Sequence, residues 1–205
     1  MKGVIVVGNC LDSNLACEEC AGAFVIGADK GARYCLQNGI EMDLALGDFD
    51  SLSLIEKKEI EKKAKKVIEL NPVKDDTDTA HALSLLPFCS EIVVLGGIQG
   101  KRIEHFLAIL DLLAKDSRVV LKDSNSFIKI FGPGEYDVGK GDYRFVSFFA
   151  LEDAVLSLEG FAYPLKERLL ERFDPLGVSN EIIGETGRLD LKSGRLLMVC
   201  SKDDA

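Results

Sequence analysis

The sequence predicts an α/β fold, with a mostly parallel, Rossmann-like sheet and flanking helices, followed by a C-terminal antiparallel β-sandwich domain. Up to Ile130, short apolar runs alternate with helical patterns, which is typical of βαβ units. Beyond it, Gly132, Pro133 and Gly134 interrupt the chain, and β-rich segments follow at short spacing. Because domains usually meet at segments rich in Gly and Pro, we expect an α/β domain at residues 1–131 and a β-sandwich at residues 135–205.

The expected elements follow from the hydrophobic pattern along the chain. Apolar runs predict parallel strands at residues 4–7, 23–26, 44–46, 67–70, 92–95 and 119–121. Periodic patterns between them predict helices at residues 13–21, 31–38, 53–65, 77–86 and 102–114. In the second domain we expect strands at residues 143–151, 154–158, 187–191 and 196–200. The carboxyl ends of the parallel strands should meet at one sheet edge, where open α/β sheets bind their ligands.

Composition restricts the class of protein. The chain has 205 residues, enough for a substantial core, and its 34 acidic and 25 basic residues give a net charge of −9. This charge argues against nonspecific nucleic-acid binding, although a few local cations or a divalent metal can still reverse the field within one site. No run approaches the roughly 20 apolar residues that span a bilayer, and the apolar start is strand-like rather than a signal peptide. We therefore expect a cytoplasmic protein with no nucleic-acid or membrane partner.

Six cysteines raise the question of a metal site or disulfides. Cys17 and Cys20 have the spacing of a zinc or redox pair, but no second pair accompanies them and both histidines lie far away in sequence. We interpret the two cysteines as small helix residues in a reducing compartment.

Acidic side chains follow three of the predicted strands. Asp48 and Asp50 come directly after one strand, Asp29 follows another, and a cluster with Asp75 and Asp78 follows a third. An Asp-x-Asp sequence alone could be a helix cap or an ordinary turn. Three clusters at one sheet edge are harder to explain in this way, because like charges repel unless a cation neutralises them. The sequence therefore predicts a cation site, with Mg²⁺ as the simplest ion because it takes oxygen ligands and shares a substrate's phosphates.

A glycine-rich loop follows the strand predicted at residues 92–95. Gly97 and Gly100 would let backbone amides approach phosphate oxygens, and the helix that begins after them adds a partial positive charge. Arg102 could grip a phosphate with two hydrogen bonds. As a tight connection between a strand and a helix the loop would need no ligand, so both interpretations stay open on this motif alone.

Taken in order, these motifs resemble those of the thiamine pyrophosphokinase family. The shared segments are Ala-Asp-Lys-Gly-Ala at residues 28–32, Gly-Asp-Phe-Asp-Ser at 47–51, Asp-Asp-Thr-Asp at 75–78 and the glycine-rich loop that runs to His105. In the second domain, Ser179 and Asn180 match a Ser-Asn pair of the family. The resemblance spans nearly the whole chain.

The resemblance implies an ATP-dependent thiamine diphosphokinase, which transfers the diphosphoryl group of ATP to thiamine and yields AMP and thiamine diphosphate. It further implies a homodimer with the active site at the subunit interface. The residues that it assigns to Mg²⁺ are Asp48, Asp50, Asp75 and Asp78, and those that it assigns to catalysis are Asp48, Asp50, Asp78 and Arg102. Those assigned to ATP and its phosphates are Asp29, Lys30, Gly97, Gly100, Arg102 and His105, and those assigned to thiamine are Ser179 and Asn180.

Several residues depart from the family pattern. Lys30 stands where Gly is common, Glu104 where Asp is usual and Ile109 where Asn is expected, and the chain has no Trp. These departures leave the cation site intact but bear on the substrate. Two alternatives therefore stay open at this point: a diphosphokinase for another alcohol, such as a hydroxymethylpterin, and a noncatalytic module that senses a nucleotide or thiamine.

Overall fold

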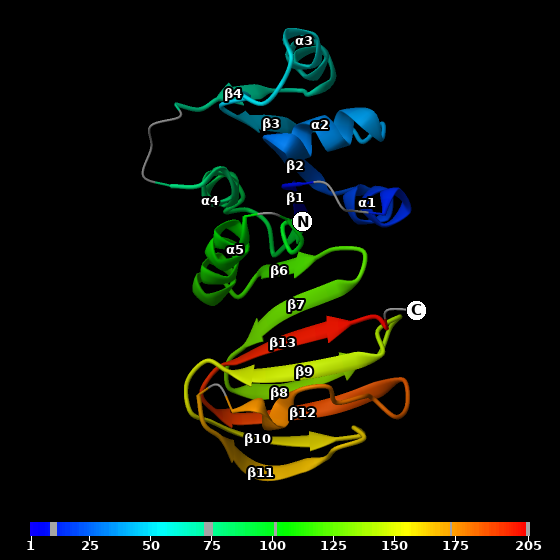
Figure 1. Ribbon diagram of the computed structural model, residues 1–205, viewed down its shortest axis with the longest axis vertical. Helices are drawn as coiled ribbons and strands as arrows, with labels where there is room; N and C mark the ends of the chain where they lie inside the picture. Colours follow the sequence, from blue (N-terminus) through cyan, green and yellow to red (C-terminus); the bar gives the residue numbers. More distant parts are fainter. Residues whose placement is uncertain (9–11, 72–75, 101, 173, 204–205) are drawn as a thin grey trace. The chain divides into compact units, whose positions relative to one another are not determined.

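The chain forms two compact units, Met1–Ser124 and Asn125–Ala205. The computed structural model describes residues 1–8, 12–71, 76–100, 102–172 and 174–203 (Figure 1). The first unit combines strands with helices, whereas the second is built almost entirely of strands. The two units therefore correspond to two different fold classes within one chain.

A parallel sheet forms the centre of the first unit. Its strands are β1 (Lys2–Val6), β2 (Phe24–Ala28), β3 (Leu44–Gly47), β4 (Val67–Glu69), β5 (Glu91–Leu95) and β6 (Val119–Lys122). Their order is β4-β3-β2-β1-β5-β6, and all neighbours in this order pair in parallel. The central strands are apolar and almost completely buried, as expected for a parallel sheet that is covered on both faces.

Helices connect these strands. They are α1 (Ser13–Cys20), α2 (Lys30–Gln37), α3 (Leu54–Lys63), α4 (Asp78–Ser84) and α5 (Ile103–Lys115). Side chains cap three of the helix starts: Asp12 at α1, Ser53 in a reciprocal capping box with Glu56 at α3, and Thr77 at α4. Each cap satisfies amides that the first helical turn leaves without a carbonyl partner, and so defines where the preceding loop ends.

The strand order of the first unit reverses between β1 and β5. Open α/β sheets bind ligands outside the carboxyl ends of their strands at such a point. The loops that leave β1 and β5 touch there, because a Cβ placed on Gly96 would lie 3.4 Å from the backbone N and O of Gly8. Gly96 also has a φ of 83°, which favours glycine, so this residue permits both the turn and the close approach.

The second unit consists of two antiparallel sheets. One contains β7 (Ser126–Phe131), β13 (Leu196–Ser201) and β9 (Phe145–Ala150) in that order, and the other contains β11 (Leu165–Leu170), β10 (Ala154–Glu159), β12 (Thr186–Ser193) and β8 (Gly134–Gly139). Both sheets contribute side chains to one core, in which the rings of Phe148 and Phe161 meet edge-on at 5.7 Å. A short 3₁₀ turn, η1 (Pro175–Gly177), lies against β9.

The predicted fold class is confirmed, with a parallel sheet and helices followed by a β-sandwich. The sequence pattern does not predict β7, β8 and β11, however. β8 begins at Gly134, inside the segment that the glycines indicate as a linker, and it pairs with β12. β11 reads Leu-Lys-Glu-Arg-Leu-Leu and is mostly exposed, so it lacks the alternation of a half-buried strand.

Candidate active site

The loop after β3 carries two of the acidic residues. β3 ends at Gly47, where φ is 151° and where a Cβ would lie 2.0 Å from Oδ1 of Asp29, so only glycine fits. Asp48 and Asp50 follow on either side of Phe49, whose φ is 55° and whose side chain is buried. The Asp50 amide donates to Oδ1 of Asp48 at 3.1 Å, which closes a tight turn. A buried ring thus anchors the loop between its two acids.

Asp29 lies between the end of β2 and the start of α2. Its φ of 47° and ψ of −114° are unusual for a residue with a side chain, and its carboxylate does not cap the helix. Its backbone amide donates to the Leu46 carbonyl at 2.9 Å, and its carboxylate accepts a hydrogen bond from the Phe49 amide. Asp29 therefore faces the loop after β3 instead of its own helix.

A third carboxylate comes from α4. Asp78 is the first residue of this helix, which Thr77 caps by accepting a hydrogen bond from the Ala80 amide at 3.1 Å. The carboxyl groups of Asp29 and Asp78 lie close enough to share a hydrogen bond when one of them is protonated. The charge of Asp48 also acts on Asp29. Asp29 and Asp78 therefore lie side by side, and Asp48, from a third connection, is near enough for its charge to act on Asp29.

The Asp29 carboxyl is electrostatically unusual. Burial, followed by the neighbouring carboxylates of Asp78 and Asp48, raises the pKa of Asp29 to about 7. Its Oδ1 atom is buried without a hydrogen-bond donor in the part of the chain that the structure describes. A cation would neutralise this cluster and use the buried oxygen, so these carboxylates fit a hard divalent ion.

The side chains that the structure describes do not form a complete metal site by themselves. Within residues 1–8, 12–71, 76–100, 102–172 and 174–203, no three His, Cys, Asp or Glu side chains are arranged as a ready-made ion site. Asp50 is exposed, and Asp75 lies outside the described residues. This arrangement suits Mg²⁺, which keeps several waters and binds through one or two carboxylates together with substrate phosphates.

Arg33 contacts the acidic loop, although the sequence analysis does not single it out. It lies on α2, and its guanidinium donates to the backbone carbonyl of Ser51 at the end of the loop. It also pairs with Glu56, with 3.0 Å between Nε and Oε1. No motif in the sequence marks Arg33, because its contacts form only when α2 packs beside the acidic loop.

The glycine-rich motif follows β5. Gly97 has a φ of 86°, and a Cβ there would lie 2.6 Å from Cδ1 of Ile109, whereas a Cβ at Gly100 would meet open space. Arg102 is exposed at the start of α5, where its Nε donates to Oε1 of Glu104 at 2.7 Å. This hydrogen bond lowers the pKa of Glu104. Arg102 is therefore paired with one of the residues that depart from the family pattern.

Lys30 and His105 occupy the first turns of two helices. Lys30 is the first residue of α2 and is exposed. His105 lies in the first turn of α5, is also exposed, and donates its amide to the Arg102 carbonyl at 3.1 Å. Both helices begin at the carboxyl edge of the parallel sheet, so both side chains can meet an anionic ligand there.

Ser179 and Asn180 lie in the second unit, and they differ in burial. Asn180 is 3% exposed; its Oδ1 accepts from the amides of Tyr163 at 3.0 Å and Glu181 at 2.9 Å, and its Nδ2 donates to the Tyr163 carbonyl at 2.8 Å. Ser179 is exposed, has a φ of 58° and donates its amide to Oγ of Ser147 at 3.0 Å. Asn180 therefore fixes the backbone of this turn, and Ser179 is presented to solvent.

A shallow surface depression lies between α2 and α3. Its lining residues are Arg33, Leu36, Gln37, Glu56, Glu59, Lys62 and Lys63. It contains none of the three clustered carboxylates and its charges are mixed. The carboxylate cluster, and not this depression, is therefore the candidate active site.

Comparisons with known proteins match both units. The family model described as "Thiamin pyrophosphokinase, catalytic domain" matches residues 20–122, and "Thiamin pyrophosphokinase, vitamin B1 binding domain" matches residues 135–196. A Bacillus subtilis protein named thiamine pyrophosphokinase is 37% identical over 186 residues, which is 87% of each chain.

Solved structures agree with this match. A thiamine pyrophosphokinase from Bacillus subtilis has a TM-score of 0.90 and 34% identity, and the alignment covers 99% of this chain and 100% of that one. One from Geobacillus thermodenitrificans has a TM-score of 0.87 and 28% identity over 100% of this chain and 99% of the other. Within the described residues, no helix has the length and apolarity needed to cross a membrane.

Proposed function

The chain belongs to the thiamine pyrophosphokinase family, and from this premise we propose that Asp29, Asp48 and Asp78 form the centre of its active site. The enzyme transfers the diphosphoryl group of ATP to thiamine, giving AMP and thiamine diphosphate. The meeting of carboxylates from the β2, β3 and α4 connections supports the assignment, because it lies where a parallel sheet binds its ligands.

Asp48, Asp50 and Asp78 are the proposed ligands of Mg²⁺, with Asp75 as a further ligand and Asp29 beside them. The burial of the Asp29 carboxylate and its repulsion by Asp78 and Asp48 support a cation beside these residues, because a divalent ion would neutralise their charges. When bound, the ion neutralises charge on the phosphate oxygens of ATP. One carboxylate of the cluster accepts the proton that the thiamine hydroxyl loses as it attacks the β-phosphorus and AMP leaves.

The loop after β5 and the starts of α2 and α5 are proposed to hold the phosphates. Gly97 and Gly100 allow backbone amides to approach phosphate oxygens, and the first turn of α5 adds its partial positive charge. Arg102, Lys30 and His105 extend from these helix starts. Arg102 would exchange its exposed partner Glu104 for phosphate oxygens, at small cost because exposed ion pairs contribute little to stability.

Ser179 and Asn180 are proposed to serve thiamine in different ways. Asn180 is occupied by the backbone of Tyr163 and Glu181, so it shapes the turn. Ser179 is the exposed residue of the pair, and its hydroxyl is the group offered to the substrate.

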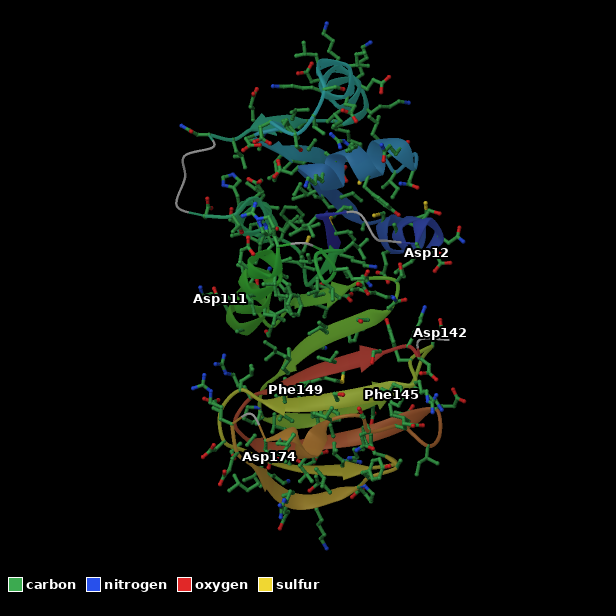
Figure 2. All side chains as sticks on the ribbon, in the orientation of Figure 1. Asp12, Asp111, Asp142, Phe145, Phe149 and Asp174 are labelled. Atoms are coloured by element: carbon green, nitrogen blue, oxygen red, sulfur yellow. The ribbon has the colours of Figure 1, made fainter. Side chains whose placement is uncertain are left out.

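A homodimer is proposed on the basis of one apolar sheet face. Leu197 of β13 lies in register with Ile130 of β7 and Phe149 of β9, on the side opposite to buried Leu196 and Met198. Figure 2 shows Phe149 on β9, where it is half-buried. A second copy would cover this face, and the active site is proposed to lie at the subunit interface.

The cysteines support a cytoplasmic location, which we propose for the enzyme. Those that the structure describes, Cys17, Cys20, Cys35, Cys89 and Cys200, are all free thiols. Free thiols of this number are typical of a reducing compartment.

The assignment is tested by measuring AMP and thiamine diphosphate from ATP and thiamine, with and without Mg²⁺. We expect equal amounts of both products, only with the metal.

Asp48→Asn, which removes a charge with little change in volume, should lower the rate at least a hundredfold without lowering the melting temperature. Unchanged turnover in this variant would refute the proposed metal site, and AMP without thiamine diphosphate would indicate hydrolysis or another acceptor.

A further inference from the structure

The acidic loop at residues 47–51 is held at two points, by Asp29 just before α2 and by Arg33 within it. In its first half, the Asp29 carboxylate accepts a hydrogen bond from the Phe49 amide. The Asp29 amide donates a hydrogen bond to the carbonyl of Leu46, just before the loop, at 2.9 Å. At its far end, the guanidinium of Arg33 donates to the carbonyl of Ser51. The helix α2 and the residue that precedes it, Asp29, therefore hold both the start and the end of the segment that contains Asp48 and Asp50.

The contact at the far end continues into α3. Arg33 pairs with Glu56, and Oε2 of Glu56 accepts hydrogen bonds from the Ser53 amide at 2.8 Å and the Ser53 hydroxyl at 2.7 Å. The Ser53 hydroxyl in turn accepts a hydrogen bond from the Glu56 amide at 3.3 Å. The capping box of α3 thus orients the carboxylate that holds Arg33, and the side chain of Arg33 is only 26% exposed.

The conformation between these two points is one that a free chain rarely adopts. Phe49 has a φ of 55°, which is unfavourable for a residue with a ring side chain, and Asp48 accepts the Asp50 amide at 3.1 Å. Such a conformation persists only where the surrounding contacts determine it. Lysine would reproduce the contact of Arg33 only in part, because its ammonium keeps the charge but lacks the planar fork that meets a carbonyl and a carboxylate together.

We propose that Arg33 is a positioning residue, which holds residues 47–51 in the shape that binds the divalent cation and thereby sets the affinity of the site for that ion. This inference rests on the proposed role of Asp48 and Asp50 as metal ligands. Residues that orient metal ligands typically change metal affinity tenfold to a hundredfold when they are removed. Arg33 does not touch the substrate in this role, so its loss should weaken metal binding more than it slows turnover at saturating metal.

The test measures Mn²⁺ binding by the full-length protein, by electron paramagnetic resonance, with and without a non-hydrolysable ATP analogue. Arg33→Met removes the guanidinium and keeps an unbranched apolar stem, and Arg33→Lys keeps the charge. Hydrogen exchange of the amides at residues 48–52 reports whether the loop loses its fixed shape. Mg²⁺ dependence of the rate then separates a change in metal affinity from a change in kcat.

Arg118 offers a matched control. It precedes β6, at the amino edge of the parallel sheet and hence at the edge opposite to the acidic loop. It is also a structural arginine, which pairs with Asp116 at 2.6 Å and donates to the Leu86 and Cys89 carbonyls at 3.3 Å and 2.9 Å. Arg118→Met should therefore destabilise the protein without changing Mn²⁺ affinity.

We expect Arg33→Met to weaken Mn²⁺ binding about tenfold and to speed exchange at residues 48–52, with a smaller effect in Arg33→Lys. Mn²⁺ binding and exchange that match the wild type in Arg33→Met would overturn the inference, as would an equal loss of affinity in Arg118→Met. Asp48→Asn distinguishes this failure from that of the metal site itself. If Asp48→Asn also binds Mn²⁺ as the wild type does, the acidic loop does not hold the ion and both proposals are overturned.

Discussion

In the candidate active site, the residues that shape the acidic loop are those whose backbone has the least freedom. Asp29 and Phe49 both adopt positive φ, and Gly47 lies where a side chain would collide with the Asp29 carboxylate. Strained conformations of this kind cost about 1–3 kcal/mol each and persist where the surroundings determine them. At this site, the hydrogen bonds between Asp29 and the loop after β3 determine these conformations. The residues with a strained backbone are therefore the same residues that position the carboxylates.

Gly47→Ala should destabilise the protein by at least about 2 kcal/mol, because it combines an unfavourable φ with a Cβ 2.0 Å from Oδ1 of Asp29. The rate of thiamine diphosphate formation should also fall in this variant. Gly100→Ala is the matched control, since a Cβ there meets no neighbour, and its stability should stay within about 0.5 kcal/mol of the wild type. Urea unfolding measures both variants, and equal stabilities would contradict the prediction.

Asn180→Ala should cost about 2–3 kcal/mol of stability, since it leaves the Tyr163 and Glu181 amides without their acceptor. The KM for thiamine should rise, whereas the KM for ATP should not change. Ser179→Ala should keep the wild-type stability to within about 0.5 kcal/mol but raise the thiamine KM. Thermal unfolding and substrate titrations separate the two residues, and a larger stability loss in Ser179→Ala would reverse their assigned roles.

Side-chain chemistry at the residue scale was predictable where it depends on neighbours in sequence. The positions of Asp48 and Asp50 directly after a strand, and of Asp78 at the start of a helix, follow from the sequence pattern, and their role as site residues stays a prediction. The contacts of Arg33 and Glu104 were not predictable, because each forms only after elements pack or a side chain selects one rotamer. The same reason explains why the sequence could not distinguish buried Asn180 from exposed Ser179.

At the scale of elements, α1 is tied to the parallel sheet by one carboxylate. Glu19 of α1 accepts hydrogen bonds from Lys2 of β1 and from Lys122 of β6, the latter at 2.6 Å. Burial alone would raise the pKa of Glu19, but the hydrogen bonds and charges of Lys122 and Lys2 outweigh it and hold the pKa below the ordinary value. A helix with little apolar surface of its own is thus fixed by a partly buried ion pair.

This ion pair predicts a pH dependence of stability. Because the pKa of Glu19 is lowered in the folded state, its contribution is present above the ordinary glutamate range and is lost as the pH falls through the lowered pKa. Glu19→Gln should therefore cost about 1 kcal/mol at neutral pH, and the difference from the wild type should shrink in acid. Urea unfolding of both proteins at neutral and at acid pH tests this. A stability difference between them that grows in acid would contradict the prediction.

Element boundaries followed the sequence well where caps mark them. The Ser53 and Glu56 capping box fixes the start of α3, and Thr77 fixes that of α4. β8 and β11 were not predicted, because each is stabilised by its partner strand rather than by a pattern of its own. Such strands depend on pairing with residues far away in the chain, and a short stretch of sequence does not show this pairing.

At the scale of the whole molecule, two units with separate cores share one function. The alternation of strand and helix was enough to predict the parallel sheet, and the dense turns were enough to predict antiparallel strands after it. The family motifs extend over both units, and the matches at residues 20–122 and 135–196 agree with that extent.

Phe149→Glu should weaken the proposed dimer at least tenfold, because it places a charge on the apolar face formed with Ile130 and Leu197. Lys166→Glu, on exposed β11 of the other sheet, is the control and should leave association unchanged. Sedimentation velocity over a range of protein concentrations measures both. A wild-type protein that stays monomeric throughout would refute the dimer itself.

The crowding of Asp29, Asp48 and Asp78 has a consequence for how long a protein molecule survives in a cell. A site that repels itself lowers the free energy of unfolding of the empty enzyme, and bound ligand restores it by mass action, by about 2.7 kcal/mol at a hundredfold excess over its Kd. Proteases act on transiently unfolded chains. Enzyme molecules with bound metal and nucleotide should therefore be degraded more slowly than empty ones. The concentration of the substrate would then help to set the amount of enzyme in the cell.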